Sequence, residues 1–114
     1  MTTHDYPAIR TELHEGYRAL NKAIPDQMKG FSTLHRSAVA DGALPAATKE
    51  LMAVAIAIST QCDDCMTLHL HDALRAGATR EQVYETIGVA LLMGGGPAST
   101  YATHALSALE QFDA

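Results

Sequence analysis

Four residues with side chains suited to thiol or metal chemistry lie close together in the sequence. They are Glu50, Cys62, Cys65 and His69, and the two cysteines form a C-x-x-C pair. Such a pair can cycle between dithiol and disulfide, supply half of a zinc site, or simply be two buried thiols. In a cytosolic protein it is more often redox-active or metal-binding than a structural disulfide.

The spacing of the cysteines and the histidine places all three on one face of a helix. At about 100° per residue, their side chains project within about 60° of one another. An imidazole one turn from Cys65 can accept the thiol proton, and the resulting thiolate is the nucleophile that attacks a peroxide or a disulfide. A helix N-terminus would stabilise the thiolate, whereas the carboxylates of Asp63 and Asp64 would oppose it.

Glu50 is unusual because it precedes an apolar segment and is expected to face along it. The positions three, four, seven and eight residues beyond it are Ala53, Val54, Ala57 and Ile58. Removing a carboxylate from water costs several kcal/mol unless the group is paired or protonated. We therefore interpret Glu50 either as a proton acceptor beside His69 and the thiols, or as a helix residue that reaches water.

The pattern E-x(11)-C-x-x-C-x-x-x-H resembles that of the alkylhydroperoxidase D-like proteins of the carboxymuconolactone decarboxylase family. The resemblance covers roughly residues 28–112, including Leu44-Pro45, the Gly77–Thr79 junction and the Gly94–Pro97 turn. It implies a single all-α domain over residues 1–114. It also implies an oligomer, commonly a homotrimer or homohexamer.

The resemblance further implies a thiol-dependent antioxidant oxidoreductase, a peroxidase or disulfide reductase that needs no bound cofactor. Glu50, Cys62, Cys65 and His69 would form the catalytic set, with Glu50 and His69 relaying the proton. The family assigns the attack to Cys65 and the resolving step to Cys62, whereas a thioredoxin-type reading would reverse this order. The substrate would be a hydroperoxide, the electron donor a lipoylated or thioredoxin-like protein, and a peroxiredoxin a further partner.

Three alternatives remain open at this stage. Glu50, Cys62, Cys65 and His69 could be four ligands of a zinc ion. The chain could be a non-redox lactone decarboxylase, although that chemistry does not require a dithiol. It could also be a structural oligomer whose thiols are incidental.

The elements that must position these residues are all predicted to be helices. Apolar residues recur at helical spacing along the chain, and Thr79 with Gln82 forms a capping box. We predict a bundle of about six helices, near residues 9–24, 26–41, 45–58, 62–76, 79–93 and 98–112. The segment Leu51–Ile58 is apolar on every side, which is typical of a buried helix and favours a homo-oligomer in so small a domain. His35 and His104 lie beside apolar stripes and are expected in the core or an interface, whereas His4 is expected to be solvated.

Composition and charge exclude several other classes of protein. The 114 residues include eight Lys and Arg against 13 Asp and Glu, a formal net charge of −5. The basic residues are scattered, so no nucleic-acid footprint is predicted. The longest apolar run is far shorter than the roughly 20 residues of a membrane span. The polar N-terminal segment, residues 1–5, does not resemble a signal peptide, so we expect a cytoplasmic protein.

Overall fold

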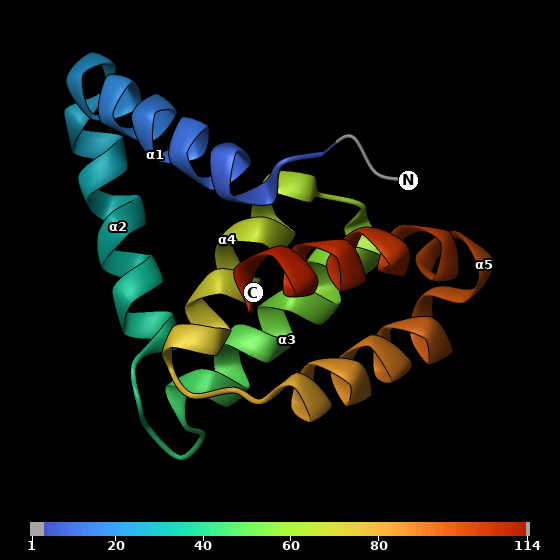
Figure 1. Cartoon of the computed structure of the whole chain (residues 1–114). Helices are drawn as coiled ribbons and strands as arrows, with labels where there is room; N and C mark the ends of the chain where they lie inside the picture. Colours follow the sequence, from blue (N-terminus) through green and yellow to red (C-terminus); the bar gives the residue numbers. More distant parts are fainter. Residues whose placement is uncertain (1–3, 114) are drawn as a thin grey trace.

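The computed structural model describes residues 4–113, so the beginning of the N-terminal segment, Met1–Thr3, lies outside the described residues. Within this range the chain forms five helices and no strand (Figure 1). They are α1 (Tyr6–Ala23), α2 (Pro25–Val39), α3 (Ala46–Thr60), α4 (Asp63–Arg75) and α5 (Arg80–Phe112). The all-α prediction is confirmed, but the number of helices is five and not six.

The difference in number arises at the predicted break, which lies inside α5. Gly95 has φ 67° and ψ −149°, and helical dihedral angles resume directly after it. The helix reverses its direction there, so that its two halves run back along each other (Figure 1). A Cβ atom on Gly94 would lie 2.6 Å from the Cβ of Ala98. The reversal therefore needs glycine at both positions, one for its conformation and one for its small size.

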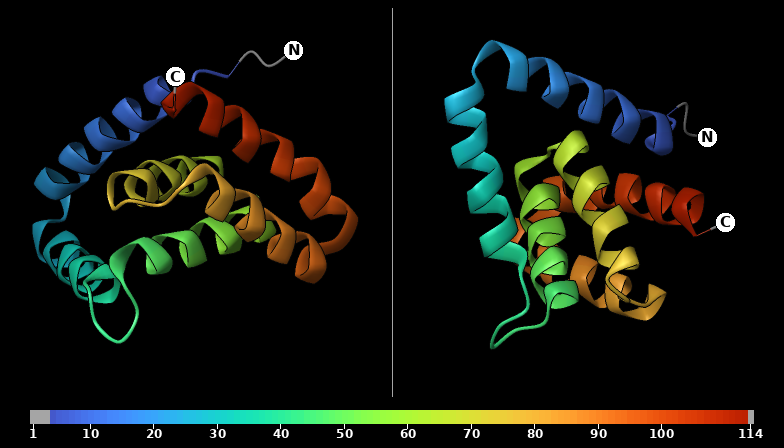
Figure 2. Two further views of the ribbon diagram at one scale, coloured as in Figure 1. Left: turned by 60° about the horizontal axis from the view of Figure 1, so that its bottom comes forward. Right: turned by 90° about the vertical axis from the view of Figure 1, so that its left-hand side faces the viewer.

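Helix α3 lies at the centre of the bundle and packs mainly against α4 and α5 (Figure 2). Val54 and Ile58 on α3 and Leu70 on α4 are fully buried in this core. The apolar segment Leu51–Ile58 is covered only in part by the rest of the chain, as expected for so small a domain. Met52 and Ile56 remain 51% and 63% exposed, on a face of α3 that lines a pocket.

Helices α1 and α2 meet at one end and diverge from there, forming an open, V-shaped hairpin beside the α3–α5 core (Figure 2). Each contributes a single buried residue, Tyr6 and Met28. The radius of gyration is 14.3 Å, somewhat above the roughly 13 Å of a compact chain of this length. The hairpin thus extends away from the core and forms one wall of a pocket.

The turn between α3 and α4 sets the orientation of the cysteines. Gln61 ends α3 in the left-handed conformation, with φ 57°. Cys62 follows at once as the N-cap of α4, and its backbone N–H donates to the carbonyl of Ala57 at 3.0 Å. The predicted capping box of Thr79 and Gln82 is confirmed at the beginning of α5. Among residues 4–113, no helix combines the length and the apolar character that crossing a membrane requires.

Candidate active site

The packing of α3 on α4 brings Glu50 directly against His69. The Oε1 atom of Glu50 lies 2.6 Å from the Nδ1 atom of His69. The Glu50 side chain is 7% exposed and that of His69 is 21% exposed. A carboxylate so far removed from water needs such a partner, and the pair is arranged to hold or pass a proton. Of the two interpretations of Glu50, the structure therefore favours the paired carboxylate over a side chain that reaches water.

The two cysteines lie at the start of α4 and are joined by a disulfide, with their Cα atoms 5.3 Å apart. The Cys62 sulfur accepts a hydrogen bond of 3.1 Å from the backbone N–H of Cys65. Cys65 is the more exposed of the two. It precedes His69 by four residues on α4, so both lie on the same helical face. The structure thus pairs Glu50 with His69 and Cys62 with Cys65, and it places Cys65 and His69 in the lining of one pocket.

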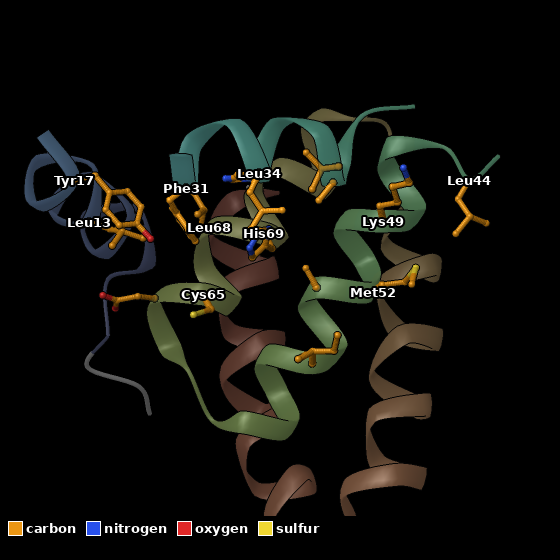
Figure 3. A pocket seen from close by; sticks show the side chains of 16 residues that line it. Leu13, Tyr17, Phe31, Leu34, Leu44, Lys49, Met52, Cys65, Leu68 and His69 are labelled. Carbon is orange, nitrogen blue, oxygen red and sulfur yellow. The ribbon is translucent and has the colours of Figure 1, made fainter. Parts of the chain in front are cut away.

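Cys65 and His69 also line a pocket of about 520 Å³ between the α1–α2 hairpin and the α3–α4 pair (Figure 3). Most of its wall is apolar. The apolar residues that line it are Leu13, Tyr17, Phe31, Leu34, Ala38, Val39, Leu44, Met52, Ala53, Ile56 and Leu68. A mostly apolar cavity with a few polar groups on one side is typical of a small-molecule site.

His35 lines the same pocket, which differs from its expected place in the core or an interface. Its ring centroid lies 5.5 Å from that of His69. The sequence placed His35 beside an apolar stripe of its helix, but it did not indicate which element that stripe faces. Phe31, Leu34, His35 and Ala38 recur at helical spacing, and this is the α2 face that forms the pocket wall.

A second group of titratable residues lies at the N-terminus of α4 and involves Asp63. Its Oδ1 atom accepts a 2.6 Å hydrogen bond from the Tyr101 hydroxyl and lies 3.2 Å from His104 Nδ1. His4 Nε2 is 3.9 Å from the other carboxylate oxygen. His104 is thus paired with Asp63 at the surface of the bundle, and His4, expected to be solvated, lies beside them.

This second group alters the pKa values of its members. Burial of Asp63 would raise its pKa, but the hydrogen bonds from Tyr101 and His104, together with the charge interactions with His104 and His4, outweigh burial and lower it. Burial and the neighbouring Asp63 carboxylate raise the pKa of the Tyr101 hydroxyl. Asp63 therefore stays ionised and ties the first turn of α4 to the second half of α5.

The geometry does not offer the four-ligand zinc site considered from the sequence. The disulfide occupies both sulfur atoms, so neither is available as a thiolate ligand. Two other groups each bring three possible ligand atoms within 4.8 Å of one another. One is His35, Glu50 and His69, and the other is His4, Asp63 and His104.

Known proteins with similar sequences and structures agree with this arrangement of helices. An uncharacterized protein of Cupriavidus necator is 44% identical over 114 residues, covering both chains completely. The crystal structure of a carboxymuconolactone decarboxylase family protein from Legionella pneumophila is 40% identical with a TM-score of 0.92, over 96% of this chain and 97% of that one. A family member from Thermotoga maritima, for which a part in an antioxidative response has been suggested, is 30% identical with a TM-score of 0.78, over 90% of each chain.

The sequence model of the carboxymuconolactone decarboxylase family matches residues 25–108. This match covers α2, α3, α4 and most of α5, and it includes all four residues of the candidate active site. The chain therefore belongs to the carboxymuconolactone decarboxylase family.

Proposed function

We propose that the protein is a thiol-dependent peroxidase that reduces organic hydroperoxides through Cys62 and Cys65. The observation that carries this proposal is the buried 2.6 Å contact between Glu50 and His69. His69 lies one helical turn from Cys65, which belongs to a C-x-x-C pair of the kind that can be redox-active. A structural disulfide would need no buried carboxylate–imidazole pair beside it. Such a pair suits a nucleophilic thiol, whose proton must be removed before attack and returned to the leaving group.

In the proposed cycle, His69 takes the proton of the Cys65 thiol, and Glu50 stabilises the positive charge that forms on the imidazole. The Cys65 thiolate attacks the outer oxygen of the hydroperoxide. An S–O bond forms, the O–O bond breaks, and the leaving alkoxide takes the proton from His69 to become the alcohol. Cys65 is now a sulfenic acid, oxidised by two electrons.

Cys62 completes the cycle as the resolving thiol. It attacks the sulfenic sulfur of Cys65, which releases water and forms the disulfide seen in the structure. A dithiol donor then returns the two electrons by thiol–disulfide exchange and becomes a disulfide itself. A reducing cytoplasm supplies such donors, of the lipoylated or thioredoxin-like kind, and a peroxiredoxin would be a related partner.

Accessibility supports Cys65 as the attacking residue. Cys65 is exposed and lines the pocket, whereas Cys62 is less exposed and caps α4. The pocket wall is largely apolar, so it favours a hydroperoxide with a hydrocarbon substituent over hydrogen peroxide. Leu34 on α2 and Met52 on α3 both line this pocket and are available to contact such a substituent (Figure 3).

We further propose that the chain acts as a homo-oligomer, a trimer or a hexamer. Large apolar side chains on the first half of α5 remain exposed, including Leu92 at 79% and Met93 at 78%. On a monomer such a surface is unfavourable, and a second copy would remove it from water. Light scattering tests this expectation, and a mass near that of one chain at micromolar concentration would contradict it.

The proposed activity is tested by mixing the fully reduced protein with cumene hydroperoxide. Both thiols should be lost for each hydroperoxide consumed, and one alcohol should form. Addition of a dithiol donor should then give several turnovers. The proposal is wrong if the hydroperoxide persists while both thiols remain titratable in folded protein.

A further inference from the structure

Two imidazoles and one carboxylate meet beside the pocket, contributed by three different helices. One ligand atom from each of His35, Glu50 and His69 lies within 4.8 Å of the other two. His35 belongs to α2, Glu50 to α3 and His69 to α4. Two histidines and one carboxylate are the donor set of several zinc and iron sites that keep an open position for a small ligand.

We propose that His35, Glu50 and His69 form a binding site for a divalent transition-metal ion, for which zinc is the best fit. Imidazole nitrogen and carboxylate oxygen are both ordinary zinc ligands. This site is distinct from the four-ligand set suggested by the sequence, because it uses neither cysteine. It therefore exists in the disulfide form of the protein.

Burial and charge favour a cation at this place. The Glu50 residue is only 5% exposed. Among residues 4–113, His69 is its one side-chain hydrogen-bond partner. A buried carboxylate with a single side-chain hydrogen-bond partner is only partly compensated, and a divalent ion would supply the opposite charge. The ion would also have an open side, because His35 and His69 line the pocket.

His35 is free to serve as a ligand. Within the described part of the chain its imidazole forms no hydrogen bond or ion pair, and its ring lies against that of His69. Because His35 lines the pocket, its imidazole ring has open space in which to rotate toward an ion.

Two of the three donors need only a small adjustment to hold an ion, and the third, on His35, lies within 4.8 Å of both. Zinc lies about 2.0–2.2 Å from nitrogen and oxygen ligands, which places neighbouring ligand atoms roughly 3–3.5 Å apart. The Glu50 Oε1 and His69 Nδ1 atoms are 2.6 Å apart. If both atoms bind, they must therefore separate by less than about 1 Å, and the proton between them must leave when the metal binds.

The group at Asp63 provides a matched comparison within the same molecule. His4, Asp63 and His104 also bring three ligand atoms within 4.8 Å of one another. Asp63, however, already accepts hydrogen bonds from Tyr101 and lies against His104. The His4 and Asp63 side chains are 42% and 32% exposed, so water can reach both.

The test is a calorimetric titration of the full chain with zinc chloride, with the disulfide kept intact so that no thiolate can bind metal. We expect one ion per chain. Glu50→Gln and His35→Gln should each weaken binding by about 10²-fold or more. His104→Gln, a matched change in the other group, should leave binding unchanged. Zinc should raise the melting temperature of the wild type and of His104→Gln, but not that of His35→Gln.

X-ray absorption at the zinc edge gives a second measurement that does not depend on the variants. It should show two imidazole ligands and no sulfur. The proposal is wrong if a sulfur ligand is seen, if wild-type binding is no tighter than that of His35→Gln, or if His104→Gln is the variant that loses binding. Because no turnover is measured, failure of this site and failure of the proposed peroxidase activity would be seen separately.

Discussion

Two carboxylate–histidine groups flank the cysteine pair, and they differ in burial and in how fully their hydrogen bonds are satisfied. Glu50 is buried and has one side-chain partner among residues 4–113, His69, on the side of α4 that faces the pocket. Asp63 is about one-third exposed and is held by Tyr101 and His104 from α5. Glu50 and Asp63 both lie near the cysteines in the sequence, yet their surroundings suit the two carboxylates to different roles.

The comparison shows that proximity to a thiol does not by itself make a carboxylate part of a proton relay. The hydrogen bonds of Asp63 lower its pKa, so it holds its negative charge and acts as a structural tie. Glu50 shares one short contact with a histidine in a site of restricted water, where a proton can be exchanged between them. We therefore expect changes at Glu50 to affect chemistry and changes at Asp63 to affect stability.

The largest expected effect is that of the attacking cysteine itself. Cys65→Ser should abolish hydroperoxide turnover. Cys62→Ser should still allow one oxidation, on Cys65, detectable as a sulfenic acid adduct with dimedone by mass spectrometry. An adduct on Cys62 in the Cys65→Ser protein would show instead that the order of attack is reversed.

The second-largest expected effect distinguishes the role of Glu50 from that of Asp63. Glu50→Gln should slow hydroperoxide reduction by about 10²–10⁴-fold, the usual contribution of a positioned general base. Its melting temperature should change little, because an amide is easier to bury than a carboxylate. Asp63→Asn, the matched change in the other group, should alter the rate far less. Stopped-flow measurement of disulfide formation checks both variants, and similar rate losses in the two would remove the distinction drawn here.

The pocket should contribute a smaller, substrate-dependent effect. Leu34→Glu places a charge on the apolar wall and should slow reduction of cumene hydroperoxide by about tenfold, as expected for loss of an apolar contact worth 1–3 kcal/mol. Reduction of hydrogen peroxide should be nearly unchanged. Thr33→Glu is the control, because Thr33 is exposed on the same helix and does not line the pocket. Equal effects on both peroxides would show that the substrate does not occupy this pocket.

The smallest effect is expected from loss of the hydrogen bond between Tyr101 on α5 and Asp63 on α4. Tyr101→Phe removes a hydrogen bond to a charged group and should lower the free energy of unfolding by about 1–2 kcal/mol. The rate of hydroperoxide reduction should remain close to that of the wild type. Denaturant unfolding of the variant measures the loss, and an unchanged midpoint would show that Asp63 does not tie α4 to α5.

The interactions of Asp63 with Tyr101 and His104 also predict that the stability of the protein depends on pH. Because the pKa of Asp63 is lowered in the folded protein, its contribution to stability is fully present above the unfolded pKa of about 3.9. That contribution is lost as the pH falls through the lower folded pKa. The stability difference between wild type and Asp63→Asn should therefore be largest above about pH 4 and shrink in more acidic solution. A difference that grew on acidification would contradict this assignment.

What the sequence could predict was set by local interactions. The capping box of Thr79 and Gln82 and the shared face of Cys65 and His69 depend on residues within one or two helical turns, so spacing alone predicts them. The contact between Glu50 and His69 could be predicted because the apolar pattern of α3 indicated which way Glu50 faces.

The remaining features depend on how distant segments return to the site. Tyr101 and His104 reach Asp63 across 38 and 41 residues, and they do so only because α5 reverses at Gly95. His35 reaches the pocket because the α1–α2 hairpin lies beside the core. Helical spacing carries no information on either arrangement.

The most direct test of the central claim is the pH dependence of Cys65 alkylation by iodoacetamide, measured in the Cys62→Ser background. If Glu50 acts through His69 on the thiol, Glu50→Gln should move the reaction midpoint to higher pH, because the imidazolium that stabilises the thiolate loses its partner. Asp63→Asn should leave the midpoint in place or move it slightly lower, because a nearby negative charge is removed. An unchanged midpoint in Glu50→Gln, with an upward shift in Asp63→Asn, would contradict the account.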